Sequence, residues 1–96
     1  MSKKAKGKVK ASHILVAKLS QASDIIEELK MGGNFAELAK KHSTCSSSKK
    51  GGNLGQFGRG QMVPEFEKAA YALNVGQITD LPIKTQFGYH VIKRTG

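Results

Sequence analysis

The sequence has a single cysteine, Cys45, so it cannot form a disulfide within the chain. This excludes a small secreted scaffold held together by disulfides and fits a reducing compartment. The sequence also lacks a run of about 18 consecutive apolar residues, the length that a membrane-spanning helix needs. Its N-terminus is positively charged but lacks the apolar stretch of a signal peptide. We therefore expect a cytoplasmic protein.

Acidic residues are scarce in comparison with basic ones. The 96 residues include 16 Lys and Arg against 7 Asp and Glu, and the formal net charge is +9. The first ten positions contain lysines but no acidic residue, which is typical of a flexible, solvated tail, placed here at residues 1–7. The alternative is that these lysines contact an anionic membrane surface or nucleic acid. A salt titration of liposome or DNA binding, with and without residues 1–8, distinguishes the two.

The remaining residues, 8–96, have enough apolar content for one compact domain. Apolar residues alternate or recur at helical spacing in the order strand, helix, helix, strand, helix, strand, strand. A loop rich in Ser, Lys and Gly separates the second helix from the second strand. The elements are expected at residues 8–16, 21–31, 34–41, 53–57, 64–73, 78–83 and 89–95, with the loop at 42–52.

Three local signals support the expected helices. The pair Gly32-Gly33 is a stop signal for the first helix. Asn34 and Glu37 have the spacing of a capping box at the start of the second helix. Pro64 fits the first turn of the third helix, where its missing N–H is not needed.

Several residues have side chains suited to catalysis or ligand binding, although each also has an ordinary structural interpretation. A histidine in a strand is more often a packed, hydrogen-bonded residue than a catalyst, and methionine near phenylalanine is more often core packing. A cysteine beside a histidine is an alternative nucleophile, and a zinc site is a weaker alternative because the ligands occur singly. The residues concerned are His13, His42, Cys45, Met62, Phe66, Phe87 and His90.

Five sequence blocks follow one another along the chain, at residues 13–16 (His-Ile-Leu-Val), 35–43, 51–57 (Gly-Gly-Asn-Leu-Gly-Gln-Phe), 58–66 and 86–93 (Gln-Phe-Gly-Tyr-His-Val-Ile-Lys). In this order they resemble the parvulin family of peptidyl-prolyl cis/trans isomerases. The resemblance extends over about nine-tenths of the chain. It implies an α+β fold, β-α-α-β-α-β-β, with a four-stranded antiparallel sheet flanked by helices.

The resemblance also implies the activity and the site. It implies a monomeric enzyme that isomerises Xaa-Pro bonds in peptides and in unfolded or folding proteins, without a metal or cofactor. The catalytic positions of the family match His13, Cys45, Thr85 and His90, of which the two histidines form a buried, hydrogen-bonded pair linked to the threonine. The substrate proline is expected to contact Leu54, Met62, Phe66 and Phe87.

Isomerisation is a rotation about a C–N bond whose barrier of about 18–20 kcal/mol arises from amide resonance. A catalyst therefore has to hold the proline ring, exclude water and bind the twisted amide more tightly than either planar form. Many parvulins have aspartate at the position of Cys45, which argues against covalent chemistry. Because the pocket is expected to face solvent in part, replacing Met62 or Phe66 with Ala should reduce turnover while the fold survives.

One branch of the family recognises phosphorylated Ser/Thr-Pro through a basic loop after the first strand. This chain has Ala-Lys-Leu-Ser at residues 17–20, where Lys18 is the sole cation. Lysine lacks the planar fork with which arginine binds phosphate in bidentate fashion. We therefore expect little dependence on phosphorylation. An alternative to catalysis is a binding module that holds extended chains in the same groove.

Overall fold

The computed structural model describes residues 8–96, and the lysine-rich tail predicted at 1–7 lies outside the described residues. The four strands form one antiparallel sheet in the order β2-β1-β4-β3, which confirms the expected α+β fold. The elements are β1 (Val9–Val16), α1 (Leu19–Lys30), α2 (Phe35–His42), a 3₁₀ helix (Ser46–Lys50), β2 (Asn53–Phe57), α3 (Pro64–Ala72), β3 (Ile83–Thr85) and β4 (Gly88–Arg94).

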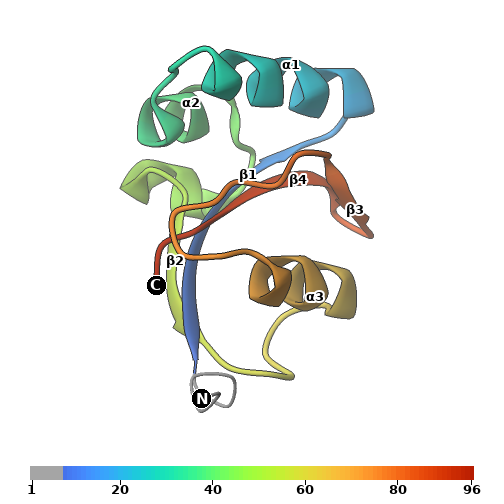
Figure 1. Ribbon diagram of the computed structural model, residues 1–96. Coiled ribbons are helices and arrows are strands. Elements are labelled where there is room, and N and C mark those ends of the chain that lie inside the picture. Colours follow the sequence, from blue (N-terminus) through green and yellow to red (C-terminus); the bar gives the residue numbers. More distant parts are fainter. Residues whose placement is uncertain (1–7) are drawn as a thin grey trace.

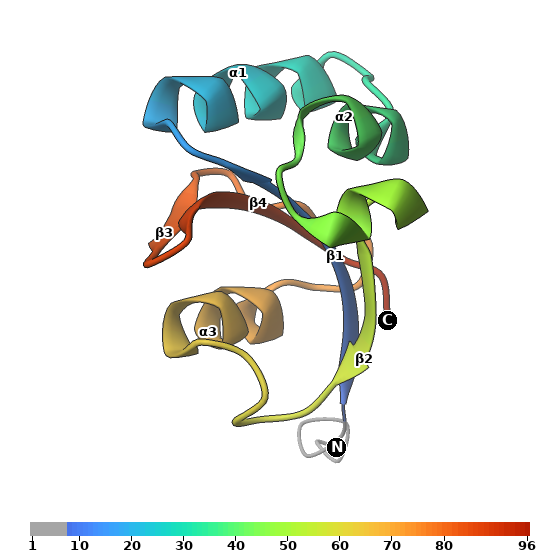
Figure 2. The same cartoon turned by 180° about the vertical axis from the view of Figure 1, so that it is seen from behind.

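The sheet separates two hydrophobic clusters. Helices α1 and α2 cover one face of the sheet and α3 covers the other (Figure 1; Figure 2 shows the same layers from behind). Successive residues of a strand point to opposite faces, so Ile14 and Val16 of β1 pack under α1 and α2. Val9 and Ala11 of the same strand pack with α3.

The local signals place the helix ends well. The Asn34 side chain accepts a hydrogen bond from the backbone N–H of Glu37 at 2.9 Å, so the predicted N-cap of α2 is confirmed. Helix α1 begins at Leu19, two residues before the expected start, because Gln21 Oε1 accepts from the Lys18 N–H at 3.1 Å. Part of the expected loop at 42–52 is a 3₁₀ helix that ends at Lys50 and is capped by Gly51.

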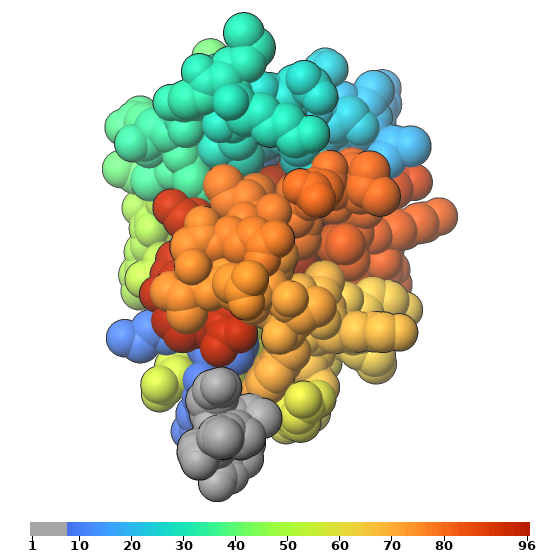
Figure 3. Space-filling view, viewed as in Figure 1, coloured from blue at the N-terminus to red at the C-terminus, as the bar shows by residue number. Residues whose placement is uncertain are grey.

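The prediction of a strand at residues 78–83 is wrong. Ile78 forms only an isolated bridge with Lys93, and the strand β3 begins at Ile83, where the predicted strand was to end. Pro82 has no N–H to donate to a neighbouring strand, so the pairing is interrupted before it resumes. In the space-filling view this connection, coloured orange, covers the surface between the α1 and α3 layers (Figure 3).

The start of β1 lies beside the end of the chain. The Lys10 N–H donates to the Gly96 carbonyl at 3.1 Å, and the Thr95 N–H donates to the Lys10 carbonyl at 2.8 Å. The two ends of the described domain are therefore adjacent. Within residues 8–96, the helices are too short or too polar to cross a membrane.

Candidate active site

An apolar cavity of about 380 Å³ opens on the face of the sheet that α3 covers. It is built from strands β1, β2 and β4, from α3, and from the connections between them. Seven of the eight predicted site residues line it, and Thr85 lies directly behind His90. The lining residues are His13, Leu15, Cys45, Leu54, Gln61, Met62, Val63, Phe66, Phe87 and His90.

Two buried histidines lie in the wall of the cavity. His13 of β1 and His90 of β4 are 5% and 3% exposed, and their Nδ1 atoms are 3.0 Å apart. The two rings are nearly parallel, at an angle of 23°. Because His13 and Leu15 lie on the same face of β1, and Leu15 is opposite His90 in the register, the strand pairing itself brings the histidines together.

Thr85 extends this pair into a chain of three side chains. Its Oγ1 lies 2.7 Å from His90 Nε2 and also accepts the Phe87 N–H at 3.1 Å. The second bond holds the turn between β3 and β4, which contains Phe87, to the Thr85 hydroxyl. The predicted link from Thr85 to the histidine pair is thus present.

The hydrogen bonds require a single proton between the two Nδ1 atoms, so that one ring donates and the other accepts. Neutral rings satisfy this arrangement. His13 Nε2 is buried and has no hydrogen-bond partner among residues 8–96. It lies in the ring that Phe66 contacts edge-on, with the ring centroids 5.5 Å apart.

Burial opposes a positive charge on either ring. The pKa of His13 falls from 6.5 to about 4, mainly because of this burial and to a smaller extent because of repulsion from His90. Burial also lowers the pKa of His90. Near neutral pH the wall of the cavity is therefore uncharged, which suits an apolar substrate ring.

Phe66 is both a cavity residue and a core residue. It is 3% exposed and makes edge-on contacts with both histidines and a tilted contact with Phe57 at 5.9 Å. The premise that Phe66 faces solvent in part is therefore wrong, and we expect its removal to destabilise the fold as well as the site. Met62 is half-buried and packs only at the margin of the same cluster, so for Met62 the expectation stays a prediction.

Two glycines allow the backbone to approach the site closely. Gly52 has a φ of +89°, and its carbonyl accepts the His13 N–H at 2.9 Å. A Cβ at this position would collide with the His13 carbonyl oxygen. Gly88 has a φ of +139°, and a Cβ there would lie 2.6 Å from the carbonyl oxygen of Val16. Both positions therefore require glycine.

The segment that carries Met62 into the cavity is held by α3. Glu67 Oε1 accepts the Gly60 N–H at 2.7 Å, and Glu67 Oε2 lies 3.3 Å from Arg59 Nη1. The Gln61 side chain accepts the Gly58 N–H at 2.6 Å. These bonds fix the connection from β2 to α3, and thereby the position of Met62.

Cys45 lies half-buried at the start of the 3₁₀ helix and lines the cavity. Within residues 8–96, no hydrogen bond joins its sulfur to a histidine: His13 and His90 bond to each other, and the Nε2 atom of His13 has no partner. His42 is exposed on α2 and does not line the cavity. The described part of the chain contains no cluster of three metal-binding side chains.

Three cavity residues were not predicted from the sequence: Leu15, Gln61 and Val63. Leu15 follows from β-strand alternation, because it shares a face with His13. Gln61 and Val63 flank Met62 in an irregular connection, where no periodicity indicates which side chains turn inward.

Residues 4–96 match the family model described as Rotamase: PPIC-type PPIASE domain. The chain is 53% identical over 91 residues to the foldase protein PrsA of Bacillus subtilis (strain 168), covering 94% of this chain and 31% of PrsA. It therefore spans about a third of the length of the curated relatives that it matches.

Two solved structures of similar length share the fold. The solution structure of NmPin, the parvulin of Nitrosopumilus maritimus, is 55% identical, with a TM-score of 0.84, over 94% of this chain and 97% of that one. The Pin structure from the archaeon Cenarcheaum symbiosum is 51% identical, with a TM-score of 0.83, over 95% and 94%.

Proposed function

The chain belongs to the PPIC-type peptidyl-prolyl isomerase domains, the parvulins, and from this premise we propose that it isomerises Xaa-Pro bonds by noncovalent stabilisation of the twisted amide. One observation carries the proposal. An apolar cavity of about 380 Å³ ends on a neutral, hydrogen-bonded histidine pair. Such a cavity holds a proline ring while the peptide backbone passes outside it.

The roles of the side chains follow from their positions. Leu54, Met62 and Phe66 surround the ring, and Phe87, which is 61% exposed, covers it from the rim. Removing water from the substrate carbonyl favours the twisted amide, because the twisted form has lost the resonance that makes the planar carbonyl a strong acceptor. The chain Thr85–His90–His13 keeps the cavity wall rigid and uncharged.

We further propose that the substrates are unphosphorylated proline-containing segments of unfolded or folding proteins. Only Ala17 and Lys18 connect β1 to α1, so this connection has no arginine with which to bind a phosphate. The cytoplasmic location, the monomeric state and a membrane or nucleic-acid contact of the lysine-rich tail stay predictions.

The test is exchange NMR on short peptides at catalytic protein concentrations, with varied residues before proline and with matched phosphoserine-proline peptides. The unphosphorylated set should interconvert faster, since uncatalysed exchange takes tens to hundreds of seconds. A gain of at least about tenfold for phosphoserine peptides over their matched partners would contradict the proposed specificity. If no peptide exchanges faster, the domain is a chain-binding module, a role that the exposed Phe87 at the rim also fits.

Cys45→Asp should keep kcat/KM within about tenfold of the parent value, because a noncovalent mechanism needs a small polar group at this position and not a nucleophile. The same exchange measurement tests this. Cys45→Ala is the matched control for lost polarity, and circular dichroism verifies that both variants fold. Complete inactivity of a folded Cys45→Asp protein would support the nucleophile hypothesis.

A further inference from the structure

A second concave surface lies on the opposite face of the sheet from the active site. It is a groove of about 430 Å³ at the end of the sheet that α1 and α2 leave uncovered. Figure 2 shows the surrounding elements, with α2 and the 3₁₀ helix beside β2, β1 and the chain end. The residues that line the groove are Lys10, Ser12, Phe35, Ala36, Lys50, Gly51, Asn53, Lys93 and Thr95.

The floor of this groove contains a serine hydroxyl that has no hydrogen-bond partner among residues 8–96. Ser12 of β1 pairs with Lys93 of β4 on one side and with Asn53 of β2 on the other. It is 9% exposed, and no hydrogen bond joins its side chain to another residue in the range 8–96. The Ser12 oxygen is not one of the fully buried unpartnered atoms, so it is open to the groove and free to donate its proton to a ligand there.

The charged side chains that line the groove are all positive. Lys10, Lys50 and Lys93 line the groove, and no acidic side chain does. Among residues 8–96 the one ion pair joins Arg59 to Glu67, on the other side of the sheet, so the three groove lysines have no acidic partner in the described chain.

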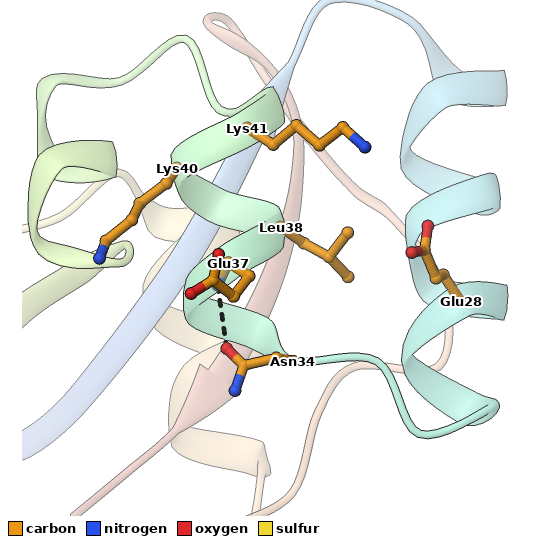
Figure 4. A pocket seen from close by; sticks show the side chains of 6 residues that line it. All are labelled: Glu28, Asn34, Glu37, Leu38, Lys40 and Lys41. Atoms are coloured by element: carbon orange, nitrogen blue, oxygen red, sulfur yellow. Dashed lines mark hydrogen bonds between the residues drawn. The ribbon is translucent and has the colours of Figure 1, made fainter.

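The sequence explains this one-sided charge. Three segments, residues 1–23, 38–64 and 81–96, contain no Asp or Glu. Each of them supplies one of the groove lysines, so the fold gathers the acid-free parts of the chain at one place. By contrast, the pocket between α1 and α2 contains Glu28 and Glu37 together with Lys40 and Lys41 (Figure 4). Its charges balance within the domain.

We propose that this groove, hereafter the lysine groove, binds an extended acidic segment of a protein chain. The surface is concave, so it fits a single extended strand better than a flat bilayer or a nucleic-acid duplex. Its only aromatic residue, Phe35, is 7% exposed and offers no face on which a base could stack. Carboxylates of an extended segment accept hydrogen bonds from Ser12 and attract the three lysines.

The bound segment belongs to the proline-containing substrate chain, and this part of the inference rests on the proposed function. A chain held in the lysine groove has a high effective concentration at the cavity on the other face. The domain measures 36 × 28 × 23 Å. About 15 extended residues, at about 3.3 Å each, are long enough to pass from one face to the other.

The first experiment measures binding without turnover. A proline-free peptide with about six consecutive glutamates is titrated into the full-length protein at low salt, and backbone amide shifts are followed by NMR. Shifts should concentrate at Ser12, Asn53, Lys93 and Thr95. Lys50→Glu and Lys93→Glu should each raise Kd about tenfold, and Ser12→Ala should raise it by about threefold to tenfold. Lys68→Glu, an exposed lysine on α3, is the matched control and should change Kd less than about twofold.

The second experiment links the groove to catalysis. A substrate with the acidic segment, a flexible linker of about 15 residues and an Ala-Pro unit should show a lower KM than the Ala-Pro unit alone. Lys50→Glu should abolish this advantage and leave exchange of the short peptide unchanged. If no peptide exchanges faster at all, the proposed function fails, whereas the first experiment still decides whether the groove binds an acidic segment.

Several results would overturn the inference. One is that the peptide shifts backbone amide signals only outside the lysine groove. A second is that the groove variants leave the Kd unchanged. Another is loss of binding when Lys3, Lys4 and Lys6 become Gln while Lys50→Glu has no effect, which would assign binding to the tail. Oligothymidylate and phosphatidylglycerol vesicles are the comparison ligands. Binding of either one, and not of the peptide, in a Lys50-dependent manner would assign the groove to a phosphate-bearing ligand.

Discussion

Phe66→Ala should lower the free energy of unfolding by about 3–5 kcal/mol and remove most of the isomerase activity. The ring is 3% exposed, packs edge-on against both histidines and joins the core cluster under α3. Its removal leaves a cavity in the core and takes away one wall of the substrate site. Urea unfolding at pH 7 measures the stability, and peptide exchange NMR on protein verified as folded measures the activity.

Two companion variants separate the structural role of this position from its catalytic role. Phe66→Leu keeps most of the apolar volume and should cost less than about 1.5 kcal/mol of stability. Met62→Ala removes a half-buried side chain at the cavity margin, so kcat/KM should fall by about tenfold while the urea midpoint barely moves. An equally large stability loss in Met62→Ala would show that Met62 supports the core and does not merely contact substrate.

Acidification from pH 6.5 to about 4 should destabilise the domain by about 3 kcal/mol through His13 alone. Burial holds the pKa of His13 in the folded protein at about 4, whereas in the unfolded chain it is 6.5. Between these values the unfolded chain binds more protons than the folded one, so stability rises with pH across the window. The contribution of neutral His13 to the free energy of unfolding is fully present above pH 6.5 and is lost as the pH falls toward 4.

Urea unfolding at several pH values measures this slope, and NMR titration of the imidazole signals identifies the residue. His42→Gln, at an exposed histidine on α2, is the matched control and should leave the slope unchanged. A His13 imidazole that titrates near 6.5 in the folded protein would contradict the prediction. It would mean that water or relaxation of the site compensates the buried charge.

Much of the fold can be predicted from local patterns, because helix caps and helix-starting prolines depend only on neighbouring residues in the sequence. Asn34 caps α2 through a bond within one turn, and Pro64 begins α3 as expected. The prediction of a strand at 78–83 is wrong because Ile78 packs against the core without regular pairing, while Leu81 is exposed. Thr79 bonds to Ile92 through both its N–H and its hydroxyl, which gives a strand-like contact without a strand.

The site was predicted through the family motifs and not through periodicity. The two histidines are 77 residues apart, and only the pairing of β1 with β4 brings them within hydrogen-bond distance. No sequence pattern shows that Phe66 is shared between core and cavity, because that depends on the angle at which α3 crosses the sheet. The lysine groove is not evident from the sequence, because only the pairing of β1 with β2 and β4 brings the three acid-free segments together.

The adjacency of Lys10 and Gly96 makes the domain easy to place inside a larger architecture. A domain whose two ends are hydrogen-bonded side by side can be inserted into a single surface loop of another domain. Such a domain does not force apart the elements between which it is inserted. The geometry is therefore compatible with a position inside a longer chain.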